Sequence, residues 1–367
     1  MQIHRVPRPA SRDAEPHPLT HAAGAVDRAG VLDDYGHTDF ADSARQLTVR
    51  LFGSEHGITR VWVALPDGVD PQTCRPEDAL GTATISLPLR EDTEKARVSI
   101  TTHPDHRSRG VARALLRAVT PHLLEQGRTT WQTYAFSPEA SGPHAVAART
   151  GAGAVDGRRP AHRWLLAEGF TLEQCERPST LVVDDALAAH TDALAEEARR
   201  SAPAASDFAL LWWADRTPEE HLTELGWLTS RMSTDVPMGE LGLDEQVWDA
   251  DRVRSAEERM AAAGLHWVVT AARHLPTGRL AGFTRLEWPE ENPAGVWQDE
   301  TLVLQEHRGR RLGMLTKTAN LARLREVNPA ARRVHTWNAA ENRWMLAIND
   351  ALGFVPVGLE GAWQKKF

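Results

Sequence analysis

The sequence has 367 residues, which is more than a typical single domain and predicts two domains. Hydrophobic residues make up 41% and charged residues 25%, ordinary values for a globular protein, so a mainly disordered chain is excluded. The 42 basic and 50 acidic residues give a net charge of −8, which argues against a general polyanion binder.

Membrane, secretion and disulfide signals are weak in this sequence. No apolar run approaches the length of a membrane span, and the first residues include no apolar segment typical of a secretory signal. Cys74 and Cys175 are far apart, so neither a disulfide framework nor a structural zinc site is supported. We therefore expect a cytoplasmic protein without a metal, a monomer or homodimer, with no membrane or nucleic-acid partner.

The first half predicts a tail followed by alternating strands and helices. Residues 1–25 are rich in Pro, His, Arg and Ala without periodicity, and predict a mobile tail. Apolar spacing and β-branched runs then predict a helix at 39–50, strands at 59–65, 81–88 and 96–102, a helix from 111, a strand at 131–136 and a helix at 162–169. Residues 184–204 predict a linker helix and joint.

The second half predicts a similar order of elements. It begins with a strand at 208–213 and a helix at 218–232, and Pro276-Thr277-Gly278 predicts the turn of a hairpin. The later elements are predicted as a strand at 300–304, a helix at 312–327, a strand at 333–337 and a helix at 340–352.

An internal repeat relates the two halves. His106-Arg107-Ser108-Arg109 recurs 201 positions later as His307-Arg308-Gly309-Arg310, in each case between a predicted strand and a predicted helix. Each half also ends in a helix closed by Gly-Phe, at Gly169-Phe170 and Gly353-Phe354. The first copy is longer, and we place its insertion in the polar, Gly-rich stretch 137–159.

The strand–arginine turn–helix unit suits an anionic ligand. A helix that starts directly after a strand presents unpaired backbone N–H groups, and its dipole favours negative charge. Neighbouring arginines add attraction for phosphate. The sequence has neither GxxxxGK[ST] nor a G-x-G-x-x-G after a strand, which disfavours a P-loop nucleotidase and the usual dinucleotide fold.

These residues resemble the GNAT (Gcn5-related) acyl-CoA N-acyltransferases. The family's cofactor motif, Q/R-x-x-G-x-G/A, is met in full by residues 107–112, and by residues 308–313 except that Arg311 replaces the first glycine. Asn342, in the run NAAENRWMLAINDALGF, falls where family members place an asparagine that contacts the pantetheine arm. The arrangement is similar to that of mycothiol synthase-like bacterial acetyltransferases with two domains.

The resemblance implies a mixed α/β fold of two tandem GNAT domains, each a twisted, mostly antiparallel sheet flanked by helices, over 26–183 and 205–367. It implies acetyl transfer from acetyl-CoA to a primary amine of a small molecule. The residues expected to bind the cofactor are Leu302, Val303, Leu304, Arg308, Gly309, Arg310, Arg311, Leu312, Gly313, Asn338 and Asn342 in the second domain, and Thr102, Arg107, Ser108, Arg109, Gly110, Val111 and Ala112 in the first.

The catalytic residues do not follow directly from the family motif, because this sequence departs from it. Many members have a tyrosine acid four residues before the terminal glycine, where this chain has Asn349 in the second domain and Leu165 in the first. For the general base we favour Glu300, with Asp299, Glu287 and, through a water, His335 as alternatives. Strand alternation places Asp299 and Glu300 on opposite faces unless a bulge intervenes. Backbone N–H groups of 302–304 are the expected oxyanion donors.

We expect the second domain to be catalytic and the first to be a structural or cofactor-retaining relic, because the first has Arg158 at the asparagine position. Two other readings remain open. The chain could bind acyl-CoA without catalysis, as a sensor or scaffold. The arginines between 308 and 325 could also form a nucleic-acid stripe, which the acidic balance disfavours.

Overall fold

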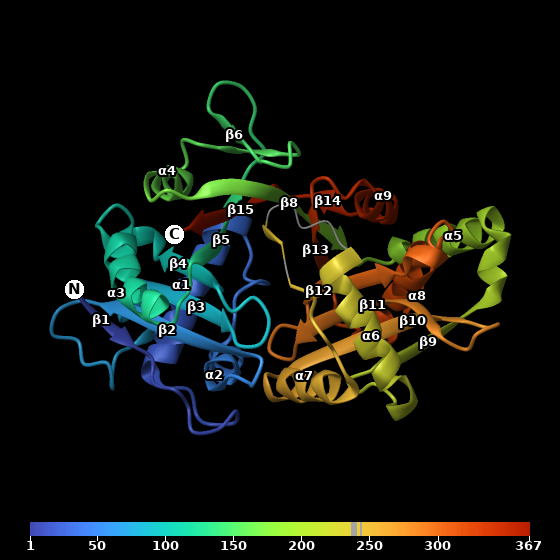
Figure 1. Cartoon of the computed structure of the whole chain (residues 1–367), viewed down its shortest axis with the longest axis horizontal. Helices are drawn as coiled ribbons and strands as arrows, with labels where there is room; N and C mark the ends of the chain where they lie inside the picture. The colour runs from blue at the N-terminus through green and yellow to red at the C-terminus, as the bar shows by residue number, and fades with distance from the viewer. Residues whose placement is uncertain (236–240, 243) are drawn as a thin grey trace. The chain divides into compact units, whose positions relative to one another are not determined.

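The computed structural model describes residues 1–235, 241–242 and 244–367. The described chain forms two compact units; in Figure 1 unit 1 runs from blue to green and includes the dark red final strand, and unit 2 runs from green to red. Unit 1 comprises Met1–Cys175 and two later pieces, Leu241 and Leu359–Phe367, and unit 2 comprises the other described residues. Across the described ranges, no helix combines the length and the apolar character needed to cross a membrane.

Unit 1 is built on a sheet with the strand order β1-β2-β3-β4-β5-β15-β8, in which β4 and β5 are parallel, while the pairs from β1 to β4 and the pair β5–β15 are antiparallel. Its strands are β1 (Gln2–Arg5), β2 (Gly57–Leu65), β3 (Gly81–Pro88), β4 (Lys95–Thr102), β5 (Thr130–Ser137), β15 (Leu359–Lys366) and the first part of β8 (Thr171–Val182). Its helices are α1 (Pro18–Tyr35), α2 (Ala44–Phe52), α3 (Val111–Glu125) and α4 (Pro160–Ala167), with short 3₁₀ turns η1 (Pro76–Asp78) and η2 (Pro104–His106).

Unit 2 repeats this plan with the strand order β8-β13-β12-β11-β10-β9, in which β12 and β13 are parallel. Its strands are the second part of β8, β9 (Phe208–Ala214), β10 (Leu265–His274), β11 (Leu280–Pro289), β12 (Gly295–Val303), β13 (Arg333–Ala339) and β14 (Val355–Pro356). Its helices are α5 (Ala186–Ser201), α6 (Glu219–Asp235), α7 (Ala250–Ala262), α8 (Leu312–Val327) and α9 (Arg343–Leu352), with η3 (Pro203–Asp207) and η5 (Gln305–His307).

The two faces of the unit 2 sheet have separate cores. Leu286 and Val296 point to the face covered by α8, where Leu315 and Leu321 pack against them. Alternate residues such as Phe283 point to the opposite face, which is covered by α6 and α7. Residues of β11 and β12 that lie away from the register shifts can therefore be assigned to one face by their place in the alternation.

The predicted mobile tail over residues 1–25 is wrong. β1 pairs with β2, with Ile3 opposite Ala64, and α1 begins at Pro18. Leu19 and Val26 of α1 are buried in the core of unit 1, because apolar residues recur at helical spacing from Leu19 onward. The proline- and histidine-rich composition concealed this amphipathic helix.

The predicted domain boundaries also need correction. β8 passes from unit 1 into unit 2 at the Cys175–Glu176 bond, and the predicted linker over 184–204 contains α5, which packs on α8 within unit 2. The last strand, β15, pairs along its whole length with β5 and so belongs to unit 1. The second domain is therefore not the continuous segment 205–367.

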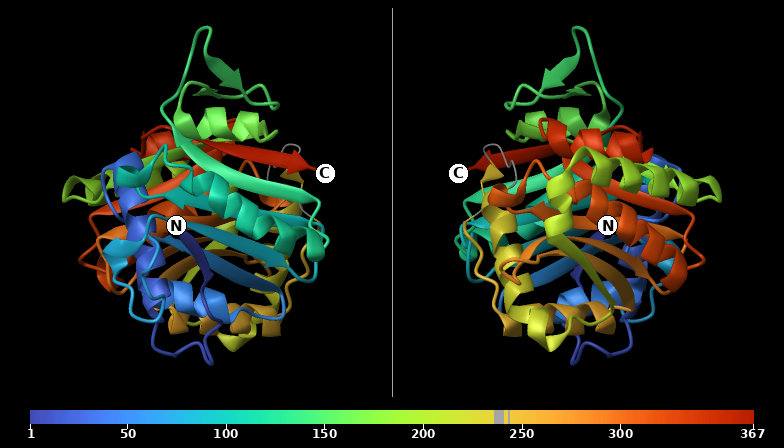
Figure 2. Two further views of the ribbon diagram at one scale, coloured as in Figure 1. Left: turned by 90° about the vertical axis from the view of Figure 1, so that its left-hand side faces the viewer. Right: turned by 90° about the vertical axis from the view of Figure 1, so that its right-hand side faces the viewer.

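The insertion predicted in the first copy is present in the structure. Residues 137–159 contain a two-stranded hairpin, β6 (Ala145–Ala147) and β7 (Ala154–Asp156), which has no counterpart among the described elements of unit 2. Figure 2 shows this hairpin projecting from the body of unit 1.

Candidate functional site

The two arginine turns have the same backbone although their glycines differ. In unit 1 the left-handed residues are Ser108 (φ 62°) and Gly110 (φ 80°). In unit 2 they are Gly309 (φ 80°) and Arg311 (φ 59°). Each turn therefore has two residues in the left-handed region. In each turn one of these two residues is a glycine and the other is not. The departure of Arg311 from the motif leaves the turn unchanged in shape.

Each turn leads directly into a helix whose first N–H groups remain available. The N-cap residues are Gly110 for α3 and Arg311 for α8, and neither helix start is capped by a side chain from the described residues. Helix starts of this kind bind phosphate oxygens through backbone N–H groups and the helix dipole. Both turns therefore have the backbone geometry to accept a phosphate group, and cofactor binding by residues 107–112 and 308–313 stays a prediction.

The arginines of the unit 2 turn are partly held by neighbouring groups. Arg308 donates from Nε to the Val303 carbonyl oxygen at 3.1 Å, and its Nη2 lies 3.4 Å from Asp235 Oδ2. Arg310 bonds the Glu306 carbonyl oxygen and lies 3.3 Å from His307 Nδ1. About half of the Arg308 side chain stays exposed, so it can still meet an incoming anion.

The sheet of unit 2 opens directly in front of this turn. β12 and β13 pair only from Gly295 to Trp297 on β12, so the rest of β12 has lost its partner on that side. Backbone N–H groups that point to this side are free to bind a ligand carbonyl. Leu304 is not one of them, because its N–H donates to the Ala281 carbonyl oxygen at 3.0 Å, so the prediction of an oxyanion donor at the Leu304 N–H is wrong. The direction of the backbone N–H alternates along a strand, so the Val303 N–H points to the side of β12 that has no partner strand there.

A bulge in β12 places both predicted carboxylates on one face. The register between β11 and β12 shifts between Thr284 and Leu286, so that Asp299 and Glu300 together oppose Arg285. Asp299 Oδ2 accepts from Arg285 Nε at 2.8 Å and also from Nη2, and Glu300 Oε2 lies 3.5 Å from Nη2. The expectation of opposite faces is therefore corrected by the bulge.

A third carboxylate completes this group. Glu287 lies two residues after Arg285 on β11, on the same face, and its Oε2 is 3.9 Å from Arg285 Nε. Sequence reasoning named all three acids but missed Arg285. The signal was available, because residues 283, 285 and 287 alternate on one face of the strand.

Two carboxylates of this group have raised pKa values. Burial raises the pKa of Glu300; the charge of Arg285 opposes that rise and Asp299 adds to it. Burial likewise raises the pKa of Glu287, with further increases from Asp299 and Glu300. A raised carboxylate pKa near the open edge of a sheet is typical of a general base.

One oxygen of Glu300 is buried and has an ion-pair partner without a hydrogen bond. Its Oε2 is out of contact with solvent and lies 3.5 Å from Arg285 Nη2, but it accepts no hydrogen bond from the described residues, although about a fifth of the side chain is exposed. A ligand N–H, such as that of an amine, would add a hydrogen bond to this oxygen.

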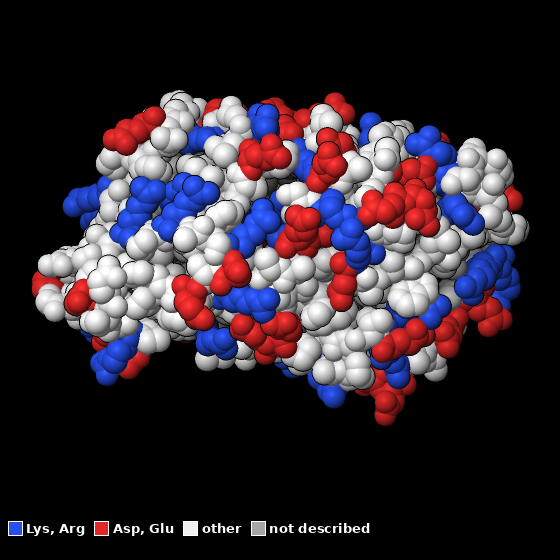
Figure 3. All heavy atoms as spheres, turned by 90° about the horizontal axis from the view of Figure 1, so that it is seen from below, with Lys and Arg blue, Asp and Glu red and all other residues white. Residues whose placement is uncertain are grey.

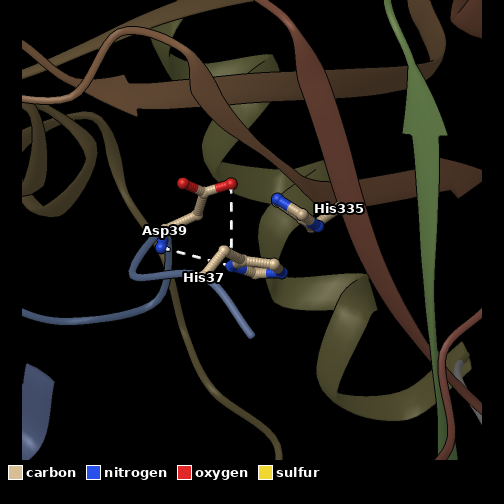
Figure 4. A group of neighbouring side chains, drawn as sticks. All are labelled: His37, Asp39 and His335. Atoms are coloured by element: carbon tan, nitrogen blue, oxygen red, sulfur yellow. Dashed lines mark hydrogen bonds and ion pairs between the residues drawn. The ribbon is translucent and has the colours of Figure 1, made fainter. Parts of the chain in front are cut away.

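The opposite wall of the opening is formed by β13 and α9. Asn349 is buried and donates from Nδ2 to Asn338 Oδ1 at 2.6 Å, while its own Oδ1 has no partner among the described residues. Asn342 is the N-cap of α9, and its Oδ1 accepts from Met345 N at 3.3 Å. His335 of β13, labelled in Figure 4, has its Nδ1 2.9 Å from Thr180 Oγ1. The three predicted asparagines thus belong to one helix–strand wall.

Comparison with known proteins identifies solved structures with a similar fold. No family model matches the sequence, and no curated protein matches it. The structure is similar over 100% of this chain and 98% of the other to a tandem GNAT protein from the clavulanic acid biosynthesis pathway, at 25% identity and a TM-score of 0.71. The chain has the tandem GNAT fold.

Two further solved structures support the fold. A GCN5-related N-acetyltransferase from Sphaerobacter thermophilus matches 99% of this chain and 95% of its own at 15% identity and a TM-score of 0.57. A GCN5-related glucosamine N-acetyltransferase region of a fungal multi-domain enzyme matches 99% of this chain, at 12% identity and a TM-score of 0.53. The predicted fold class, two tandem GNAT domains, is confirmed.

The first GNAT unit lacks the carboxylate group of the second. At the repeat offset of 201 positions, Glu300 corresponds to Ser99, Arg285 to Thr84 and Glu287 to Ser86. β3 and β4 pair without a register shift, with Thr84 opposite Ser99, so the bulge is absent as well. Thr102 corresponds to Val303 and ends β4 beside the first arginine turn. Unit 1 thus keeps the turn and lacks a base at this position.

Unit 1 has an aromatic group where its sheet opens. Tyr35 at the end of α1 lies 4.7 Å from Phe40 and 4.5 Å from Phe136 of β5, measured between ring centroids. His37 contacts the same Phe40 and accepts from the Asp39 N–H at 3.3 Å (Figure 4). These rings pack mainly against one another, so we read them as the hydrophobic cover of the unit 1 sheet.

The basic residues after the second turn do not form an isolated stripe. Arg323 of α8 pairs with Glu326 at 2.7 Å and lies over the ring of Trp212. On the face in Figure 3, basic and acidic side chains are interspersed.

Proposed function

We propose that unit 2 is an N-acyltransferase that transfers an acetyl group from acetyl-CoA to a primary amine of a small molecule. The observation that carries the proposal is the position of Glu300, a carboxylate of raised pKa, on the strand that opens and then leads into the arginine turn. The tandem GNAT fold supports acyl transfer as the general chemistry.

The proposed reaction is a direct attack on the thioester. Glu300 accepts one proton from the substrate ammonium, which leaves a neutral amine with a free electron pair. The nitrogen then bonds to the thioester carbonyl carbon, while the Val303 N–H stabilises the carbonyl oxygen as it gains negative charge. The carbon–sulfur bond breaks, the sulfur leaves as a thiolate, and the amide nitrogen loses its second proton to solvent.

A base matters more than an acid in this reaction. An alkyl ammonium of pKa about 10.4 is neutral in roughly one molecule in a thousand at pH 7, which costs about 4–5 kcal/mol. A thiol of pKa about 8.5 costs only about 2 kcal/mol to leave as the anion at pH 7. A site with Asn349 in place of a tyrosine acid is therefore chemically adequate, and the Asn338–Asn349 pair serves to hold the pantetheine arm in this proposal.

Unit 1 has a different role in this proposal. It retains the arginine turn and the open start of α3 but has Ser99 at the position of the base, so it binds acyl-CoA without transferring the acyl group. A protein in which both units only bind acyl-CoA, a sensor or scaffold, is the alternative to exclude.

The test is thiol release from acetyl-CoA by the full chain with a panel of primary amines. Glu300→Gln should lower turnover by roughly 10²–10⁴-fold with acetyl-CoA binding retained, because general base catalysis contributes about that factor. Ser99→Ala, the matched change in unit 1, should leave turnover unaltered. Tight acetyl-CoA binding with no thiol release for any amine would support the sensor instead.

Calorimetry tests which of the two units binds acetyl-CoA. Arg308→Ala should weaken a site in unit 2 and Arg107→Ala a site in unit 1. Loss of all binding in Arg107→Ala alone would contradict catalysis in unit 2.

A further inference from the structure

Each arginine turn follows a histidine that the proposed reaction does not use. His106 in unit 1 and His307 in unit 2 stand at the same place in the internal repeat. In unit 2, Nδ1 of His307 lies 3.3 Å from Nη1 of Arg310. In unit 1, Nδ1 of His106 lies 3.4 Å from Nη1 of Arg109, which has no other hydrogen-bond partner among the described residues. The same two atoms are thus paired in both turns, although a serine lies between them in one turn and a glycine in the other.

The chemistry of the two side chains fixes the direction of this hydrogen bond. A guanidinium group has only donors, so Nδ1 of the imidazole is the acceptor in both pairs. An imidazole whose Nδ1 accepts is neutral and carries its proton on Nε2. Protonation of Nδ1 would remove the acceptor and put a second positive charge beside the arginine. The histidine–arginine pair therefore forms only while the histidine is neutral.

The pair spans the part of the turn that shapes the start of the helix. In unit 2 it joins residues 307 and 310, with the left-handed Gly309 between them and the left-handed Arg311, the N-cap of α8, directly after them. Arg310 also donates from Nη1 to the Glu306 carbonyl oxygen, so its guanidinium is folded back onto η5. Both contacts hold the backbone from which the first N–H groups of α8 extend.

The surroundings of His307 favour its neutral form. Its ring centroid lies 4.8 Å from that of His274 at the end of β10 and 5.3 Å from that of Phe208 at the start of β9. Burial lowers the pKa of His307, and His274 adds to the lowering. Arg310 lowers this pKa further, while Glu306 opposes the change. The charged groups that act on the ring thus come from β10, from η5 and from the turn, and β9 adds an uncharged ring.

We propose that His307 is a positioning residue for acyl-CoA: its neutral imidazole holds Arg310 and so keeps the turn in the shape that binds phosphate, and its protonation releases both. His106 holds Arg109 in the same way in unit 1. This proposal rests on the proposed binding of acetyl-CoA at the arginine turns and adds a control of that binding by pH. The affinity of unit 2 for acetyl-CoA should be full above the pKa of His307 and should fall below it.

The experiment measures acetyl-CoA binding to the full chain by calorimetry at about pH 7.5 and about pH 5.5, on either side of the ordinary histidine pKa of about 6.5. Arg107→Ala serves as the background, because it should weaken the site in unit 1. Affinity at unit 2 should fall by roughly two- to tenfold at the lower pH, since a group that must be neutral costs about tenfold for each pH unit below its pKa. Phosphate groups of the ligand also titrate near pH 6, so the fall is measured relative to a variant without the histidine.

His307→Asn is the test variant, because the asparagine Oδ1 replaces Nδ1 as an acceptor and does not titrate. It should keep most of the wild-type affinity at the higher pH and lose the additional fall at the lower pH. His307→Gln has its amide near the place of Nε2 instead, so it should bind more weakly at the higher pH by roughly two- to tenfold, the range for one hydrogen bond. His266→Asn, at the opposite end of β10, is the control and should keep the wild-type pH dependence. His106→Asn in an Arg308→Ala background is the matched test in unit 1.

A second measurement tests the histidine–arginine pair without any ligand. NMR titration compares His307 in the wild type and in Arg310→Ala. Without the guanidinium the pKa of His307 should rise, because the neutral form loses its hydrogen bond and the charged form loses a like charge nearby. In calorimetry, His307→Asn should cause no further loss of affinity once Arg310→Ala is present, because the two side chains act as one unit.

Several outcomes would overturn the proposal. An equal fall of affinity in the wild type and in His307→Asn would show that the histidine does not control binding. Tighter binding at the lower pH that disappears in His307→Asn would mean that the histidine binds phosphate as a cation. A pKa of His307 that is unchanged in Arg310→Ala would show that the pair does not form. A pKa that rises, together with no acetyl-CoA binding at either unit, would support the pair and overturn acetyl-CoA as its ligand, so the two proposals fail separately.

Discussion

Arg308 Nη2 lies 3.4 Å from Asp235 Oδ2, and Arg107 Nη1 makes the corresponding pair with Asp33 Oδ2 at 2.6 Å in unit 1. In each unit the first arginine of the turn thus reaches an aspartate near the end of a long helix, α1 in unit 1 and α6 in unit 2. A carboxylate at the C-terminal end of a helix is unfavourable to the helix dipole, and the arginine offsets it. The pair therefore ties the arginine turn to that helix in each unit.

The same pair competes with phosphate for Arg308. In Asp235→Asn the guanidinium loses its charged partner, so acetyl-CoA affinity at unit 2 should rise by roughly two- to fivefold, the range expected for a partly exposed pair worth up to about 1 kcal/mol. Calorimetry of the full chain measures this change. A fall in affinity would mean instead that Asp235 holds Arg308 in its binding position. Asp33→Asn is the matched control, because it changes unit 1 alone.

Arg311 occupies a left-handed position that favours glycine, with φ 59°. Arg311→Gly should therefore raise the free energy of unfolding of unit 2 by up to about 1 kcal/mol, since the left-handed cost of a residue with a Cβ exceeds the entropy cost of glycine. Ser108→Gly is the matched change in unit 1. Arg310→Gly, at a position without positive φ, should destabilise. Thermal unfolding measures all three, and a loss of stability in Arg311→Gly would contradict the strain.

Much of the fold was predictable because local patterns agreed with it. The run from Gly81 to Pro88 alternates apolar and polar residues between two strand breakers, and it forms β3 with those bounds. The histidine–arginine turns were found because they recur in matching contexts. In both cases the signal lies within about ten residues, which is the range over which propensity and spacing act.

What the sequence concealed depends on partners far away in the chain. β8 contains Glu173 and Arg177, polar residues that find their partners only after folding: Glu173 lies 3.4 Å from Arg149 Nη1, and Arg177 pairs with Asp350. The bulge at Asp299–Glu300 is a property of the pairing with β11, so alternation along β12 alone gives the wrong face for one acid. The candidate base was predictable, whereas the placement of both Asp299 and Glu300 against Arg285 was not.

The pH profile of turnover tests Glu300. The base acts in its deprotonated form, so kcat/KM should rise with pH through a pKa above the ordinary carboxylate value, because burial favours the neutral acid. In Glu300→Gln this rise of kcat/KM with pH should disappear, and only a shallow rise due to deprotonation of the substrate amine should remain. If the original rise persists in Glu300→Gln, the base is another group, and Glu287→Gln is the next variant to measure.

The last strand is expected to be essential to unit 1. All eight residues of β15 pair with β5, and Trp363 of β15 is fully buried in unit 1. Deletion of Leu359–Phe367 should unfold unit 1 or lower its stability by more than about 3 kcal/mol, the cost typical of removing one buried tryptophan. Hydrogen exchange resolves the effect, with lost protection expected in β5 and retained protection in β10. Unchanged protection in β5 would contradict the strand assignment.

Lys317 is the buried charge whose removal should stabilise unit 2. It lies on α8 with 1% of its surface exposed, and its Nζ is 5.8 Å from the Phe354 ring centroid. Burial lowers the pKa of Lys317 from 10.5 to about 7. The folded state then binds fewer protons than the unfolded state between these values, so stability should rise with pH from about 7 to 10.5.

Lys317→Met keeps the volume and removes the titration. At about 1.36 kcal/mol for each pKa unit, the variant should gain up to roughly 4–5 kcal/mol at pH 7 and much less near pH 10. Denaturant unfolding at both pH values measures the difference, with Lys366→Met, an exposed lysine, as the control. A gain that does not depend on pH would attribute the effect to packing, and a loss of stability at pH 7 would mean that the buried ammonium has a partner in solution.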